Sequence, residues 1–133
     1  FRDFRVFYDW GELMKQRFEI PYKPDSVNDH WSINKDGKGL RLNKKGRKFR
    51  EAVQWYIKSK KYITFTGKIK VNIELYFKDN RKKDIDNYFK AILDSFNGFL
   101  YTDDSFIYQL KGTKKLGCDR DYFIIEVEEL EIG

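Results

Sequence analysis

Apolar and polar residues alternate most regularly over residues 66–78. The apolar members of this run are Ile69, Val71, Ile73, Leu75 and Phe77. A period of two residues predicts a strand with one buried face and one wetter face. Shorter runs with the same alternation predict further strands at residues 16–22, 105–111 and 122–130, and a brief one at 40–42.

Two stretches repeat their apolar residues at the three- and four-residue steps of an amphipathic helix. The first follows Asn43, a suitable N-cap, and runs to about residue 60. The second begins at Asp84 and stops at Asn97 and Gly98. We expect the Asp84 carboxylate near the N-cap, where it accepts hydrogen bonds from exposed backbone N–H groups. Apolar positions of the second helix are Ile85, Phe89, Ile92, Leu93 and Phe96.

The order strand, helix, strand, helix, strand, strand predicts an α+β domain. We expect a single mixed β-sheet of about four strands with two helices on one face. The helical crossovers predict parallel neighbours, and residues 112–120 predict a loop that closes a final antiparallel hairpin. Residues 16–133 are interpreted as this one domain. Residues 1–15 are interpreted as an N-terminal extension, either a docking helix or the remainder of a longer protein, because Phe4, Phe7, Tyr8 and Trp10 share a helical face.

The composition narrows the class of protein. The chain has 133 residues, enough for one domain, and 18% of them are aromatic, which argues against disorder. Lys and Arg exceed Asp and Glu to give a net charge of +6, which favours a polyanionic partner such as nucleic acid. The single cysteine, Cys118, excludes an internal disulfide. No apolar run approaches the roughly twenty residues of a membrane span, so we expect a cytoplasmic protein without a membrane partner.

Four acidic residues flank the second predicted helix: Asp84, Asp86, Asp103 and Asp104. Mg²⁺ prefers oxygen ligands, typically one or two carboxylates together with substrate phosphate and water. Asp84, Asp86 and Asp104 are suited to this task, with Asp103 as a fourth ligand or as a hydrogen-bonding support. Lys90 lies one helical turn from Asp86 and on the same face, where it would neutralise charge that develops on a phosphate. The short connection after the helix should bring both acidic pairs to one site.

A purely structural interpretation of the same residues stays open. Asp84 would then only cap the helix, Asp86 would pair with Lys90 one turn away, and Asp103 and Asp104 would form an ordinary turn. The basic clusters bear on this choice. They are Lys44, Lys45, Arg47 and Lys48, residues 58–61, Arg81, Lys82 and Lys83, and residues 111–115 with Lys114 and Lys115. Charge runs are usually solvated surface, but two of these clusters bracket the carboxylates, where a phosphate backbone would separate them.

The stretch around the second helix resembles the signature of the RusA family of Holliday junction resolvases. The residues concerned are Asp84-Ile85-Asp86-Asn87-Tyr88-Phe89-Lys90-Ala91, Leu93-Asp94, Asn97-Gly98 and Asp103-Asp104-Ser105. Upstream, Pro24-Asp25-Ser26-Val27-Asn28 is similar to that family's proline-x-serine-x-asparagine loop, and Asn43-Lys44-Lys45-Gly46 with Phe49-Arg50 is similar to the start of its first helix. These matches cover most of residues 16–130 in the family's order.

The resemblance implies a homodimeric endonuclease that cuts four-way DNA junctions by paired nicks. It implies Mg²⁺ as cofactor, with Mn²⁺ as an alternative ion, and no small-molecule cofactor. Residue by residue, Asp84, Asp86 and Asp104 match the metal-binding aspartates and Lys90 matches the catalytic lysine. Asp103 matches the acidic neighbour, and the loop with Asn28 and His30 would contact branched DNA.

Two other functions remain open at this point. One is a module that binds junctions or duplex DNA without catalysis, which the basic clusters support equally well. The other is a nuclease for flaps or single strands, which the same metal site would serve.

Overall fold

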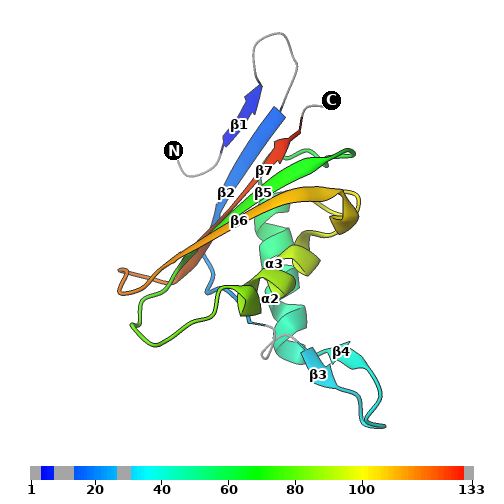
Figure 1. The fold of residues 1–133 in the computed structure, drawn as a ribbon, viewed down its shortest axis with the longest axis vertical. Helices are drawn as coiled ribbons and strands as arrows, with labels where there is room; N and C mark the ends of the chain where they lie inside the picture. The colour runs from blue at the N-terminus through cyan, green and yellow to red at the C-terminus, as the bar shows by residue number, and fades with distance from the viewer. Residues whose placement is uncertain (1–3, 8–13, 27–30, 131–133) are drawn as a thin grey trace.

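The structure, a computed structural model, describes residues 4–7, 14–26 and 31–130. Its centre is a five-stranded sheet in the order β1-β2-β7-β5-β6 (Figure 1). Only β5 and β6 are parallel neighbours, and the other pairs are antiparallel. The predicted mixed sheet is therefore confirmed. The strands are β1 (Phe4–Phe7), β2 (Met14–Ile20), β5 (Ile69–Tyr76), β6 (Ile107–Lys115) and β7 (Tyr122–Glu129).

Both helices cover the same face of this sheet, as predicted. They are α2 (Lys44–Lys58) and α3 (Asp86–Phe96), which lie side by side in Figure 1. Their apolar faces meet the inward residues of the strands in one hydrophobic core. This core holds Phe18, Ile20, Val53, Ile57, Ile73, Leu75, Ile92, Phe96 and Ile125, among others. Burial alternates strictly along β5, which is what its two-residue sequence period predicts.

The start of α2 agrees with the sequence. The Oδ1 atom of Asn43 accepts a hydrogen bond from the backbone N–H of Gly46 at 2.8 Å, so Asn43 is the N-cap. Immediately before it, β3 (Trp31–Ile33) and β4 (Leu40–Leu42) form a small antiparallel hairpin that stands apart from the main sheet (Figure 1). No helix in the described residues is long and apolar enough to cross a membrane.

The last two strands are connected differently from the prediction. β6 continues through Gly112 to Lys115, so much of the expected loop is strand. β6 and β7 are also not neighbours, because β5 lies between them. The N–H of Phe77, just after β5, donates to the carbonyl of Lys115, and the Phe77 carbonyl accepts from the N–H of Cys118. The end of β5 thus occupies the place between the two strands, and the connection passes over it.

The N-terminal residues contain a strand and not the helix considered above. Phe4–Phe7 forms β1, which pairs with β2 from Phe4 opposite Arg17 to Phe7 opposite Met14. Tyr8 and Trp10, which were part of the expected helical face, lie outside the described residues.

Candidate functional site

Asp84 and Asp86 lie where the chain enters α3. Both side chains are exposed, and neither carboxylate forms a hydrogen bond or ion pair in the part of the chain that the structure describes. The predicted capping role of Asp84 is wrong. The first turn closes through backbone groups, with the Asn87 N–H donating to the carbonyl of Asp84 at 3.1 Å, and α3 has no side-chain cap. Both carboxylates are therefore available to a ligand.

The loop that leads into α3 is held by Asp79. Its Oδ1 atom accepts from Nζ of Lys83 at 2.5 Å and from the backbone N–H of Arg81 at 2.9 Å. The hydrogen bond from Lys83 is the main reason that the pKa of Asp79 is lowered to about 2. The Lys114 ammonium of β6 donates in turn to the carbonyl of Lys83. The sequence predicts a turn at residues 79–81, which the hydrogen bond from the Arg81 N–H to Asp79 confirms, but not the contact between Asp79 and Lys83.

Lys90 is on the same exposed face of α3 as Asp86, as predicted, but the two are not paired. Nζ of Lys90 lies 3.4 Å from Oδ2 of Asp94, one turn further along, and its side chain is 60% exposed. Arg50 of α2 approaches the same carboxylate oxygen at 4.0 Å. The structural alternative in which Asp86 pairs with Lys90 is therefore wrong. Asp86, Lys90 and Asp94 follow one another at four-residue steps along one face of the helix.

Asp103 and Asp104 differ in their surroundings. Asp103 accepts hydrogen bonds from the hydroxyl and the backbone N–H of Ser105, and these bonds lower its pKa below the ordinary value. It thereby caps the short helix η2 (Asp104–Phe106). The carboxylate of Asp104 is exposed and has no hydrogen bond or ion pair among the described residues. Burial, and then the charges of Asp104 and Asp94, raise the pKa of Tyr101. Of the two, Asp104 is the free oxygen donor.

The two acidic pairs lie at opposite ends of α3. Asp84 and Asp86 are at its first turn, whereas Asp104 follows its last turn, beside the start of β6 (Figure 1). Eleven residues of helix span roughly 16 Å at 1.5 Å per residue. Accordingly, no three His, Cys, Asp or Glu side chains of the described residues are grouped closely enough to hold a metal ion. The expected convergence of both pairs does not occur within one chain, because the helix itself separates them.

The predicted basic residues fall into two groups. Lys44, Lys45, Arg47 and Lys48 are exposed on the first turns of α2. Arg81, Lys82 and Lys83 are brought next to Lys114 and Lys115 of β6, beside Asp84. Lys83 is half-buried, with its Nζ 5.1 Å from the centre of the Phe77 ring, and the other four are exposed. Asn28 and His30 lie outside the described residues.

Comparison with known proteins shows the family of this chain. A family model described as endodeoxyribonuclease RusA matches residues 21–128. The chain belongs to the RusA family. The crossover junction endodeoxyribonuclease RusA of Enterobacteria phage HK97 is 32% identical to it over 123 residues, covering 89% of this chain and all of the phage protein. The RusA match spans α2, β5, α3 and β6, and so includes both acidic pairs and Lys90.

Proposed function

We propose that this RusA-family protein is an endodeoxyribonuclease that resolves four-way DNA junctions by hydrolysing phosphodiester bonds. The observation that carries the proposal is the pair of exposed, unpartnered carboxylates of Asp84 and Asp86 beside a basic surface. Neither carboxylate has a hydrogen bond or ion pair among the described residues, and the chain just before them carries Lys82 and Lys83. A phosphate and a divalent cation would complete the arrangement. The RusA relationship supplies the substrate, a DNA crossover junction.

The donor set fits a magnesium ion. Asp84 and Asp86 offer two hard oxygen ligands, and Mg²⁺ typically takes one or two carboxylates together with phosphate oxygens and water. Mn²⁺ accepts the same ligands and is the alternative ion. When bound, the ion would polarise the scissile phosphodiester and lower the pKa of a coordinated water.

The protein's own residues would then orient the DNA and balance its charge. Lys90, which is exposed one turn from Asp86, would neutralise negative charge on the phosphate being cut. The Asp79–Lys83 contact keeps the loop before Asp84 in one conformation, so that the carboxylates are held in position before substrate arrives. Lys82, Lys115 and the first turns of α2 would bind the phosphates of the neighbouring strands.

A second copy of the chain would supply the missing carboxylate. Asp104 is the remaining free oxygen donor, and α3 separates it from Asp84 and Asp86 in the same chain. In a homodimer with antiparallel α3 helices, Asp84 and Asp86 of one protomer would approach Asp104 of its partner. Two such sites would form, related by the dimer axis, and paired nicks across a junction need two sites.

Strand β6 is the edge through which we propose this dimer forms. It is the last strand of the sheet, it is nine residues long, and Tyr108 and Leu110 on it are 61% and 44% exposed. Antiparallel pairing of β6 with its copy would place the basic end, with Lys114 and Lys115, opposite the acidic residues that precede the partner strand. Because α3 packs on β6 through Phe89 and Gly112, the same pairing would place the two α3 helices side by side and antiparallel.

A gel assay of the purified protein tests the function. Four-way, flap, duplex and single-stranded DNA are incubated with Mg²⁺ or with a chelator. We expect paired nicks in the four-way junction with Mg²⁺ and none with the chelator. Binding without cleavage under every ion would favour the DNA-binding module, and preferred cleavage of flaps or single strands would favour the other nuclease activity.

A further inference from the structure

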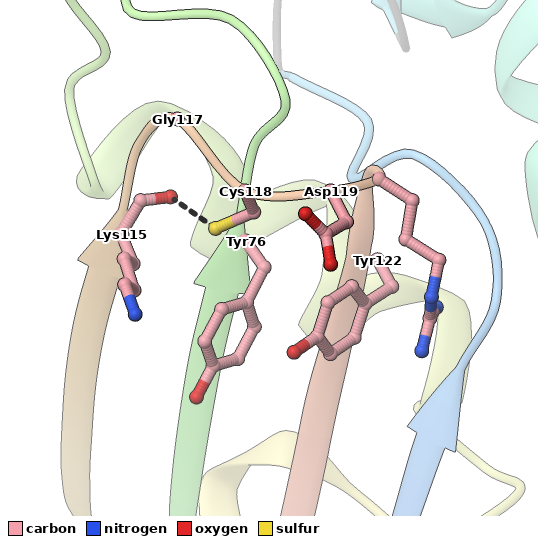
Figure 2. Close-up of a pocket in the computed structure, with 7 residues that line it drawn as sticks. Tyr76, Lys115, Gly117, Cys118, Asp119 and Tyr122 are labelled. Carbon is pink, nitrogen blue, oxygen red and sulfur yellow. Dashed lines mark hydrogen bonds between the residues drawn. The ribbon is translucent and has the colours of Figure 1, made fainter.

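A second aromatic and polar site lies on the face of the sheet away from the helices. It is a pocket of about 340 Å³ where β5 ends and β7 begins, under the loop that connects β6 to β7. Figure 2 shows Lys115, Tyr76 and Tyr122 side by side on three neighbouring strands, with Cys118 and Asp119 of the loop above them. Of the residues that line this pocket, the proposed function uses Lys115 alone.

Two tyrosines form a fixed stack in this pocket. The rings of Tyr76 and Tyr122 are 4.4 Å apart and 3° from parallel. The guanidinium carbon of Arg120 lies 4.0 Å from the centre of the Tyr122 ring, and since Tyr76 covers one face of that ring, Arg120 covers the other. Glu19 binds Arg120 at 2.9 Å. The hydroxyl of Tyr76 donates to Glu74 at 2.6 Å, which fixes the ring that ends the stack.

The remaining face of Tyr76 points to the pocket. Its neighbour on that side is Lys115 of β6, and Figure 2 shows a space between the two side chains. The Lys115 ammonium and the Asp119 carboxylate have no hydrogen bond or ion pair within the residues that the structure describes. The loop above is held by bonds from the Gly117 N–H to Asp79 and from the Lys78 N–H to Asp121, at 3.2 and 2.8 Å. These bonds hold the loop in place. Because neighbouring strands lie about 4.8 Å apart, the Lys115 side chain would swing aside when a flat ring stacks on Tyr76.

We propose that this pocket binds one unpaired base of a DNA strand, stacked on Tyr76. The flat ring of the base would extend the stack of Arg120, Tyr122 and Tyr76, and any base can stack on tyrosine. Lys115 would bind the adjoining phosphate, and the Asp119 carboxylate would accept from an N–H group on the edge of the base.

The location agrees with a role beside the acidic site. Tyr76 is followed directly by Phe77, whose ring lies 5.1 Å from that of Tyr88 on α3, and whose face Lys83 covers. The pocket and Asp84 are thus at the same end of the sheet, on opposite faces. A branched DNA has its weakest pairing at the branch, where a base leaves the stack at the lowest cost. This inference rests on the proposed function only in taking DNA as the ligand.

Photocrosslinking to single-stranded DNA tests the inference without requiring junction cleavage. The probe is a short oligothymidylate with one 5-iodouracil, and crosslinked peptides are mapped by mass spectrometry. We expect the crosslink at Tyr76 in the wild type, unchanged within about twofold in Tyr76→Phe, and reduced roughly tenfold in Tyr76→Leu, since each stacked base contributes about 1–3 kcal/mol. Trp55→Leu, which removes a 72% exposed aromatic ring of α2 away from the pocket and from β6, is the matched control and should crosslink like the wild type.

The single cysteine gives a second measurement that needs no variant. Cys118 lines the pocket, so saturating oligothymidylate should slow its labelling by a maleimide at least roughly fivefold. Labelling unchanged by the oligonucleotide, or equal crosslinking of Tyr76→Leu and the wild type, would overturn the inference. If the crosslink depends on Tyr76 but no junction is cut, the inference stands and the proposed function fails. If junctions are cut but no crosslink depends on Tyr76, the proposed function stands and the inference fails.

Discussion

The ring of Phe89 on α3 lies directly against Gly112 of β6, so that a β-carbon at Gly112 would come within 1.7 Å of its Cζ atom. The helix that carries Asp86 and Lys90 is positioned on the sheet by this contact. Glycine is required there for close approach and not for its backbone angles. The same glycine, within a run of charged residues, is the one that sequence reasoning assigned to a loop.

Replacing Gly112 should therefore weaken the packing of α3 against β6. We expect Gly112→Ala to lower the free energy of unfolding by about 1–3 kcal/mol, because Phe89 must leave its position. Gly67→Ala is the matched control, since a β-carbon there meets nothing within 4 Å. Urea denaturation measures both. Equal stability of the two variants would show that Phe89 moves aside at no cost.

The Asp79–Lys83 contact should be visible in a pH titration. Because the pKa of Asp79 in the folded protein is about 2, below the ordinary 3.8, its contribution to stability is complete above pH 3.8 and is lost as pH falls through 2. Lys83→Met should raise the pKa of Asp79 toward 3.8, as read from its carboxyl NMR signal. An unchanged pKa in this variant would mean that Lys83 does not hold the loop in solution.

The edge of β6 can be blocked without disturbing its pairing with β5. The carbonyl of Lys115 accepts from the N–H of Phe77, so the backbone groups of Lys115 point toward β5. Backbone groups of successive residues point to opposite sides of a strand. The N–H of Leu110, five residues earlier, therefore points away from β5. We expect Leu110→Pro to convert a dimer into a folded monomer, because proline is tolerated on an edge strand but cannot donate outward. Sedimentation measures the mass, and Leu110→Thr, which keeps the N–H, should remain dimeric. A proline variant that stays dimeric would place the interface elsewhere.

Mixing two inactive variants tests whether a site is shared between protomers. Asp86→Asn and Asp104→Asn should each be inactive alone. In a mixed dimer, one site would combine the intact Asp86 of one protomer with the intact Asp104 of its partner. Equal mixing should restore about a quarter of the wild-type sites, since half of the dimers are mixed and each has one intact site. The product should be single nicks and not paired cuts.

No recovery on mixing would indicate that each site lies within one chain. The control is a mixture of Asp86→Asn and Asp84→Asn, in which each site of a mixed dimer keeps one defect, so it should stay inactive at every ratio. Gel mobility of nicked and linear products distinguishes single from paired cleavage.

Local features of this fold were predictable from the sequence, because they depend on short-range spacing. The alternation around Ile73 gives β5, and Asn43 caps α2 as its side chain predicts. The connection of the last strands was not predictable. Phe77 separates β6 from β7 through backbone hydrogen bonds, and any residue type can form these. The prediction that Asp84 caps α3 was wrong for a similar reason. The backbone carbonyl of Asp84, and not its carboxylate, accepts from the N–H of Asn87.

The spacing of the candidate residues along α3 was predictable from the sequence, but their arrangement across the fold was not. The spacing of Asp86 and Lys90 predicts that they lie one turn apart on the same face of a helix, and in the structure they do so on α3. That Asp104 lies beyond the far end of α3 depends on the helix lying antiparallel to both strands it connects. The pocket beside Tyr76 also escaped prediction, because Tyr122 and Arg120 are distant in the sequence and meet only through the register of β5 and β7.

The central claim is that Asp84 and Asp86 hold a divalent ion that cuts junction DNA. Its most direct test is the rate of nicking of a four-way junction by Asp86→Asn in Mg²⁺, with binding measured in parallel by gel shift. Asp36→Asn, which changes an exposed aspartate in the turn between β3 and β4, is the control for altered charge. We expect Asp86→Asn to nick at least about a hundred-fold more slowly while its affinity for the junction stays within a few-fold of the wild type. Nicking at the wild-type rate by Asp86→Asn would contradict the claim.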